Sequence, residues 1–162
     1  MRTVITGKIV SPTIGPTRTE ADFAAHIAAT IDTDPDAPWL FVADPLDTHR
    51  SATLVEQMAR RCGSQEDLGV KGQTGILKSK QTRRAFLQDP APRIRLVYSP
   101  RHWPWLNQVE IGFSMLARQL LKRASFTTLE DLQTRVLDFI HYFNHVLSKP
   151  FRWTYTGRPL QA

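Results

Sequence analysis

An apolar residue at every fourth position predicts an amphipathic helix that begins near Thr19. Phe23, Ile27 and Ile31 fall on one side of such a helix. Thr19 and Asp22 have the spacing of a capping box in which Asp replaces the usual Glu. The pattern therefore predicts a helix that is capped at its first turn and buries a single face.

The C-terminal third, about residues 104–147, has the pattern of two more helices. The apolar residues of the first are three or four positions apart, which places them on one face. They are Leu106, Val109, Phe113, Leu116 and Leu120. The second begins at Thr127, where the letters TTLE have the spacing of a capping box. Its inner face is predicted to hold Leu132, Val136, Phe139 and Phe143.

Two short apolar runs, at residues 39–43 and 94–98, have the length of strands. The run WLFVA at 39–43 is continuous, which is typical of a strand buried on both faces. Helices are expected at about 49–61 and 80–88, with a glycine-containing loop or insertion at about 63–80 between them. A short hairpin is expected at 4–14, around Gly7. Strands that alternate with helices indicate an α/β fold.

Charge is divided unevenly along the 162 residues, whose net charge is +6. Residues 1–70 carry a net charge of −4 and residues 71–162 carry +10, and the tail at 148–162 is both basic and aromatic. A basic half indicates either a polyanionic partner such as nucleic acid or a solvated basic surface. The single cysteine excludes an internal disulfide, and no apolar run is long enough for a membrane span or a signal sequence. We therefore expect a cytoplasmic protein in one domain, 1–162.

Two carboxylates lie at positions where they could bind a ligand or a cation. Asp44 directly follows the apolar run at 39–43, and the carboxyl ends of strands in open α/β sheets are where ligands collect. Glu110 borders the apolar face of the predicted helix at 105–123, where a carboxylate needs a cation or solvent. The alternatives are that Asp44 caps the following turn and that Glu110 bends outward into water. Asp47, further along the same turn, is interpreted as a cap.

The histidines divide into two groups. His49 and His102 follow the two predicted strands, and His49 could orient a carboxylate, contact a phosphate or occupy the first turn of a helix. The other three, His26, His141 and His145, lie in predicted helices without an evident metal-ligand spacing, which indicates structural roles.

Three blocks resemble the second half of a bacterial insertion-sequence transposase of the mariner-related DDE family. The blocks are DPLDTH at 44–49, YSPRH at 98–102 and WLNQVEI at 105–111, supported by the ending KPFRWTY at 149–155. The resemblance implies a ribonuclease-H-like mixed sheet flanked by helices, as in retroviral integrases. It extends over essentially the whole chain.

The resemblance implies a two-metal site for phosphoryl transfer on DNA, in which three carboxylates hold two Mg²⁺ ions. By position, Asp44 matches the second Asp and Glu110 the final Glu. Asn107 precedes Glu110 by one helical turn and could contact the metal shell or DNA. The remaining candidates for supporting or DNA-contacting roles are His49, His102, Lys122 and Arg123.

The departures from the family pattern predict a truncated catalytic domain. The family's first catalytic Asp lies upstream of the predicted hairpin, so it and the central first strand are expected to be absent from this chain. The leading hypothesis is the C-terminal part of a DDE transposase that is inactive by itself. The alternative is a non-enzymatic, DNA-binding or interfering remnant. Either could form homo-oligomers or associate with a full-length transposase.

Overall fold

The computed structural model describes residues 3, 6–99, 108–122 and 124–150, and for residues 108–111 it describes the backbone alone. The chain divides into two compact units. The central unit is Thr13–Ile111, and the terminal unit combines Met1–Pro12 with Gly112–Ala162. The described residues contain five α-helices and a two-stranded sheet. The expected α/β class is therefore confirmed, whereas the ribonuclease-H-like detail stays a prediction.

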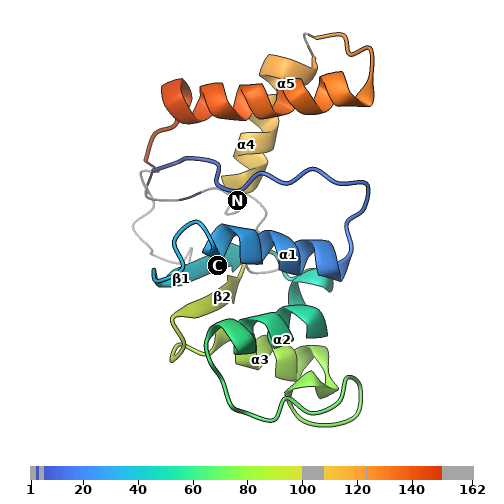
Figure 1. The fold of residues 1–162 in the computed structure, drawn as a ribbon, viewed down its shortest axis with the longest axis vertical. Helices are drawn as coiled ribbons and strands as arrows, with labels where there is room; N and C mark the ends of the chain where they lie inside the picture. The colour runs from blue at the N-terminus through green and yellow to red at the C-terminus, as the bar shows by residue number, and fades with distance from the viewer. Residues whose placement is uncertain (1–2, 4–5, 100–107, 123, 151–162) are drawn as a thin grey trace, which may run out of the picture. The chain divides into compact units, whose positions relative to one another are not determined.

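The central unit is built on two parallel strands that lie side by side in Figure 1, β1 (Trp39–Ala43) and β2 (Ile94–Tyr98). Trp39 pairs with Ile94 and Ala43 pairs with Tyr98, so the two strands end at the same edge. Both strands lie where the apolar runs predicted them. The connection between them passes through two helices, as a parallel crossover requires.

Three helices form the rest of this unit: α1 (Glu20–Ile31), α2 (Ala52–Arg61) and α3 (Lys80–Gln88). Each begins at a hydroxyl residue whose side chain accepts a backbone N–H of the first turn. These caps are Thr19, Ser51 and Ser79. The capping box of Thr19 and Asp22 is confirmed. The second helix begins three residues later than expected, because a short 3-10 turn, η1 (Thr48–Arg50), precedes it.

Among the residues that the structure describes, one face of the sheet is covered and the other is exposed. Phe41, Leu96 and Tyr98 are buried in the core with apolar residues of the helices. On the opposite face, Leu40 is 52% exposed and Val42 is 50% exposed. The expectation that β1 is buried on both faces was therefore wrong. A continuous apolar sequence shows that both faces can be buried, but only tertiary packing decides whether they are.

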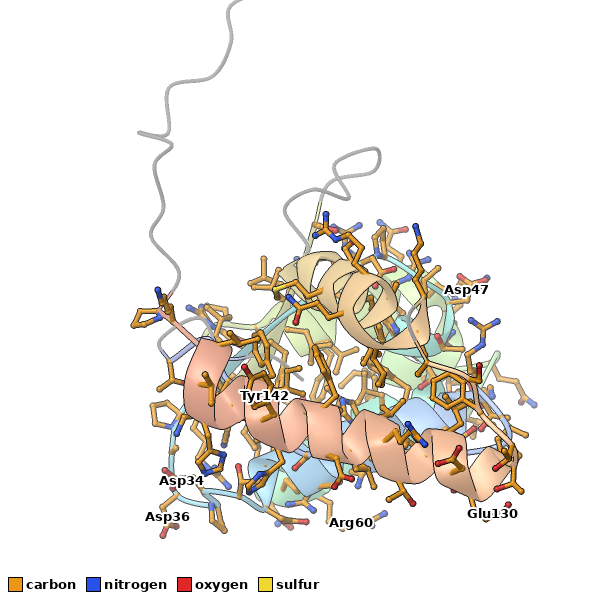
Figure 2. The ribbon with its side chains drawn as sticks, turned by 90° about the horizontal axis from the view of Figure 1, so that it is seen from above. Asp34, Asp36, Asp47, Arg60, Glu130 and Tyr142 are labelled. Carbon is orange, nitrogen blue, oxygen red and sulfur yellow. The ribbon has the colours of Figure 1, made fainter. Side chains whose placement is uncertain are left out.

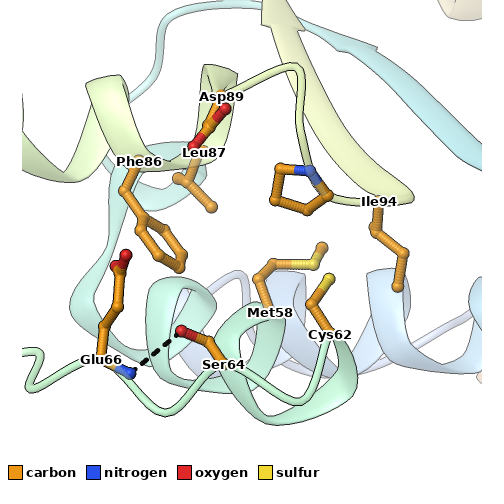
Figure 3. A pocket seen from close by; sticks show the side chains of 9 residues that line it. Met58, Cys62, Ser64, Glu66, Phe86, Leu87, Asp89 and Ile94 are labelled. Atoms are coloured by element: carbon orange, nitrogen blue, oxygen red, sulfur yellow. Dashed lines mark hydrogen bonds between the residues drawn. The ribbon is translucent and has the colours of Figure 1, made fainter.

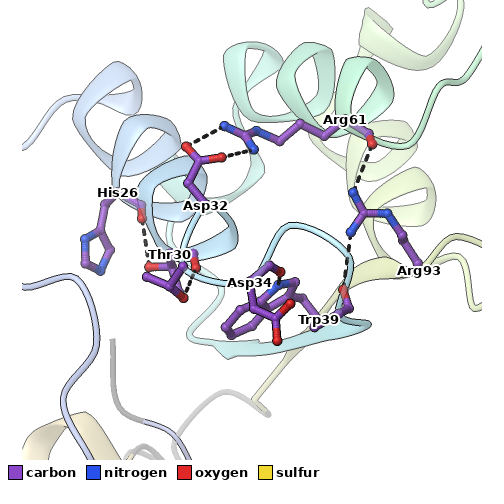
Figure 4. Close-up of polar contacts among 9 residues, drawn as sticks. His26, Thr30, Asp32, Asp34, Trp39, Arg61 and Arg93 are labelled. Carbon is purple, nitrogen blue, oxygen red and sulfur yellow. Dashed lines mark hydrogen bonds and ion pairs between the residues drawn. The ribbon is translucent and has the colours of Figure 1, made fainter.

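Polar contacts fix the loop between α1 and β1 (Figure 4). Arg61, in the last turn of α2, donates two hydrogen bonds to Asp32, at 2.6 and 3.0 Å. The indole N–H of Trp39 donates to the carbonyl oxygen of Asp34 at 3.0 Å. Arg93 donates to the carbonyl oxygens of Ala37 and Arg61. These contacts tie the start of β1 to the ends of two helices. They therefore help to position β1 and Asp44, which directly follows it.

The predicted loop at 63–80 is a loop for most of its length, with a short 3-10 turn, η2 (Ile76–Lys78). Two glycines in it approach each other so closely that neither site has room for a side chain. A Cβ on Gly69 would lie 2.4 Å from the carbonyl oxygen of Thr74, and one on Gly75 would lie 2.7 Å from that of Leu68. Both residues also have a positive φ, which favours glycine.

The terminal unit contains two helices that each continue into a π-helical segment. Helix α4 (Gln108–Leu116), which begins in the central unit, leads into η4 (Ala117–Leu121). Helix α5 (Leu129–Tyr142) leads into η5 (Phe143–Leu147). The predicted start of the second helix is wrong by one residue, because its cap is Thr128, which accepts the N–H of Asp131 at 3.1 Å. Residues 105–107 of the first predicted helix lie outside the described residues.

Asn144, in η5, joins the N-terminal segment to the last helical segment of the described chain. Its amide Nδ2 donates to the carbonyl oxygen of Ile9, and its Oδ1 accepts the N–H of Ile9, both at 2.8 Å. Gly7, which has a φ of +70°, leaves no room for a Cβ beside the backbone of Lys149. The expected hairpin is therefore seen only as a turn around Gly7, in which Thr3 and Lys8 are hydrogen bonded, and Asn144 acts as the pairing partner of Ile9.

Candidate functional site

Asp44 lies at the shared carboxyl edge of the two strands. It follows Ala43, the last residue of β1, and the N–H of Ser99 donates to the Ala43 carbonyl oxygen at 2.8 Å, one residue beyond the end of β2. The Asp44 side chain is 41% exposed, so its carboxylate is reachable from solvent. This edge of a parallel sheet is where α/β proteins bind ligands.

His49 contacts both the backbone and the side chain of Asp44. Its Nδ1 lies 3.0 Å from the carbonyl oxygen of Asp44 and 3.0 Å from carboxylate Oδ1. Because a carbonyl oxygen only accepts hydrogen bonds, Nδ1 carries the proton. The His49 side chain is only 14% exposed and stacks on the ring of Phe23 in α1, with 3.9 Å between ring centroids. The imidazole is therefore held from two sides.

Tyr98 connects the end of β2 to the same turn. Its hydroxyl donates to the carbonyl oxygen of His49 at 2.7 Å, and burial raises the pKa of this hydroxyl well above its ordinary value. The guanidinium of Arg84, in α3, lies 5.3 Å from the centroid of the Tyr98 ring. The position of His49, and through it that of Asp44, thus depends on both strands and on α1.

A network of basic side chains borders this turn. Asp47 accepts hydrogen bonds from Arg50 at 3.0 Å and from Lys80 at 2.6 Å. The hydrogen bond from Lys80 is the main reason that the pKa of Asp47 is lowered. Arg83 is buried and donates to the carbonyl oxygens of Arg50 and Leu77. Asp47 does occupy the N-cap position of η1, as a cap would, but its side chain makes no capping hydrogen bond and forms ion pairs instead.

The other predicted site residues are located less fully. The backbone of Glu110 lies in the first turn of α4, and its side chain is outside what the structure describes. Lys122 is exposed at the end of η4. His102, Asn107 and Arg123 lie outside the described residues. The convergence of Asp44 with Glu110 therefore stays a prediction.

Among the described side chains, no group of three or more His, Cys, Asp or Glu is arranged to hold a metal ion. Asp44 is nevertheless suited to contribute one ligand. His49 is the sole partner of its carboxylate within the described part of the chain, and that contact is to Oδ1 of a side chain that is 41% exposed. Carboxylate oxygens are the ligands that Mg²⁺ prefers.

A small cavity of about 70 Å³ lies elsewhere in the central unit (Figure 3). Its lining combines Met58 of α2, Phe86 and Leu87 of α3, and Ile94 at the start of β2 with loop residues that include Cys62, Glu66 and Asp89. Asp44 lies beside the opposite end of the strands, because Tyr98 is the last residue of β2. The cavity is thus not part of the Asp44 site.

Phe23 and Tyr98 are site residues that sequence reasoning missed. Phe23 follows the helical period of α1 and Tyr98 ends an apolar strand, so both carry the signal of ordinary core residues. The one available signal was the position of Tyr98 at a strand end, because a buried tyrosine hydroxyl needs a hydrogen-bond partner nearby.

Comparison with known proteins identifies the family. Residues 1–133 of the 162 match the family described as DDE superfamily endonuclease. The chain belongs to this family, and its substrate is therefore DNA, with cleavage of the transposase type. No curated protein and no solved structure shows a significant match to the chain. No described helix is long and apolar enough to cross a membrane.

Proposed function

We propose that this chain is the C-terminal part of the catalytic domain of an insertion-sequence transposase of the mariner-related type. The family match carries the proposal, and the position of Asp44 at the carboxyl edge of the parallel strands supports it. The reaction would be cleavage and transfer of DNA strands during transposition. Catalytic activity would require a third carboxylate in addition to Asp44 and Glu110.

In this proposal, Asp44 and Glu110 hold divalent metal ions, with Mg²⁺ as the natural choice. When bound, such ions activate the attacking oxygen and stabilise the leaving oxygen of a phosphodiester. The partly exposed carboxylate of Asp44 fits this role, and His49 contacts its Oδ1. Two carboxylates without a third would bind the ions weakly, because fewer anionic oxygen ligands would hold them.

His49 would act as a positioning residue for Asp44 and would not touch the reacting atoms. Its Nδ1–H fixes one carboxylate oxygen, the ring stacks on Phe23, and the backbone carbonyl of His49 accepts a hydrogen bond from Tyr98. A carboxylate that is already oriented loses less freedom when it binds a metal ion, as with hydrogen-bonded ligands in metal sites generally.

DNA would be bound chiefly through its phosphates. The +10 charge of residues 71–162 supplies the attraction, and Lys122 and Arg123 are proposed contacts. His102 and Asn107 are proposed contacts to DNA or to the metal shell. Binding of this kind would be weak, independent of sequence and steeply dependent on salt.

The experiment measures both binding and cleavage of a labelled DNA duplex by the purified chain. We expect binding that weakens steeply between 50 and 200 mM salt, a range over which phosphate-dominated complexes lose much of their affinity. We expect little Mg²⁺-dependent cleavage by this chain alone. Cleavage should appear when an upstream segment that carries the family's first Asp is added, and D44N and E110Q should then abolish it.

D47N is the matched control, since Asp47 is an exposed carboxylate three residues from Asp44 that pairs with Arg50 and Lys80. It should retain cleavage. Strong cleavage by the chain alone that requires Asp44 and Glu110 would contradict the need for a further carboxylate. Salt-independent binding, or no cleavage even with the upstream segment, would instead favour a remnant that has no catalytic role.

A further inference from the structure

Two histidines at the end of α5 lie together on the helix surface. His141 and His145 are four residues apart, and their ring centroids are separated by 4.2 Å with an interplanar angle of 33°. Both residues are exposed. Their sequence pattern predicted structural roles without a metal-ligand spacing, yet residues four apart on a helix are neighbours. Figure 2 shows this helix from Glu130, near its start, to Tyr142 at its end.

A hydrogen bond to the backbone of α5 orients the ring of His145, which lies in the π-helical segment η5. In a π-helix the backbone N–H bonds to the carbonyl five residues earlier, as Ser148 does with Phe143 at 2.8 Å. Nδ1 of His145 lies 2.8 Å from the carbonyl oxygen of His141, the residue four positions earlier.

This hydrogen bond determines which nitrogen of His145 can bind a ligand. The carbonyl oxygen accepts, so Nδ1 carries the proton and Nε2 of the neutral ring keeps its lone pair. Histidines that bind metals commonly have this arrangement, with the other ring N–H donated to a backbone carbonyl or a carboxylate. Nε2 of His145 is thus prepared for a metal, with the His141 imidazole next to it.

We propose that His141 and His145 bind a late first-row transition-metal ion, such as Ni²⁺, Cu²⁺ or Zn²⁺, on the surface of the terminal unit. Imidazole nitrogens favour these ions, whereas Mg²⁺ favours oxygen. This pair therefore differs in metal class from Asp44 and Glu110, and it does not depend on the proposed function. With two protein ligands, the ion completes its coordination with water. Asp138, three residues before His141 and exposed, is the nearest carboxylate on this helix face.

The test is calorimetric titration of the full chain with NiCl₂, comparing H141A, H145A and the double variant. We expect one Ni²⁺ per chain in the wild type. Each single variant should weaken binding at least about tenfold, because losing a ligand costs no less than losing a hydrogen-bond partner of a ligand. The double variant should be little weaker than either single one, since the two rings act together.

V146A is the matched control, because Val146 is 58% exposed and adjacent to His145 but has no ligand atom. It should bind Ni²⁺ as the wild type does. If H141A and H145A bind Ni²⁺ within about threefold of the wild type, the proposal is overturned. Circular dichroism would establish that α5 is intact in each variant.

The ligand atoms are tested by electron paramagnetic resonance with Cu²⁺ as the probe. Hyperfine structure from two imidazole nitrogens is expected in the wild type and should be lost in H141A/H145A. A two-nitrogen signal that survives in the double variant would place the ion on other histidines. Displacement of Ni²⁺ by a modest excess of Mg²⁺ would indicate oxygen ligands. Either result overturns the assignment.

Discussion

The two units differ sharply in how much apolar surface they bury. Among the described residues of the central unit, fifteen hydrophobic residues are buried, including Ile31, Leu54 and Leu96, each with essentially no exposed surface. In the described part of the terminal unit, Phe143 is the one buried hydrophobic residue, at 2% exposure. Several of its large apolar residues are exposed instead. They are Phe113, Leu121, Leu129, Leu137, Tyr142 and Val146.

This difference shows that a helical repeat and a buried core are separate properties. Both α1 and α5 have amphipathic sequences, yet α1 packs against α2 and buries its apolar face, whereas α5 buries no residue within its own bounds. The central unit is therefore stabilised by burial. The terminal unit depends more on polar contacts such as the one between Asn144 and Ile9.

The largest difference between the two units is expected when one apolar side chain is truncated in each. L54A should lower the free energy of unfolding by about 2–5 kcal/mol, because it leaves a cavity in a filled core. L137A, at a residue that is 43% exposed, should change it by less than about 0.5 kcal/mol. Urea denaturation of both variants measures the difference. Equal losses would mean that α5 is buried as deeply as the core.

The second-largest effect on stability is expected for the contact between Asn144 and the backbone of Ile9. N144L removes two hydrogen bonds to the backbone of Ile9, each worth about 0.5–1.5 kcal/mol, so a loss of about 1–3 kcal/mol is expected. Hydrogen exchange of the Ile9 amide should become faster in the variant. T134A, at an exposed position of α5, serves as the control. Unchanged protection of Ile9 in N144L would show that this contact does not hold the segment.

Acid should weaken the central unit through His26. Burial of this half-buried residue of α1 lowers its pKa from 6.5 to about 4. The unfolded chain therefore takes up the proton at a higher pH than the folded one. Stability is fully present above about pH 6.5 and falls as the pH drops toward 4, by about 1 kcal/mol after allowance for solvent screening. H26Q should flatten the stability profile between pH 6.5 and 4, and a profile as steep as that of the wild type would exclude His26 as its source.

The smallest effects are expected for ion pairs, with one matched pair in each unit. Arg61 and Asp32 form a two-bond contact between helix ends, whereas Arg135 and Asp131 pair at positions i and i+4 of α5. R61A should cost about 1 kcal/mol at most and R135A about 0.3–0.5 kcal/mol. Both losses should shrink in high salt. Thermal unfolding at two salt concentrations measures them, and a salt-independent loss would indicate that packing of the arginine stem is responsible.

Local features of the fold followed from the sequence because near neighbours decide them. The period of Phe23, Ile27 and Ile31 predicted α1, and the hydroxyl of Thr19 predicted its start. The start of the last helix was misjudged because Thr127 and Thr128 are adjacent, and either could act as the cap. Which one does is settled by the Asp131 side chain, which accepts the N–H of Thr127 and leaves Thr128 to cap.

The sequence by itself determined the helices, the two strands and the place of Asp44 directly after β1, because each depends on residues within a few positions of one another. Tertiary structure alone decided which sheet face is open, that Tyr98 reaches the backbone of His49 across 49 positions, and that Asn144 reaches Ile9 across 135. The reason is physical. Periodicity and caps record local backbone preferences, whereas a contact between distant segments forms only after packing has brought them to hydrogen-bond distance.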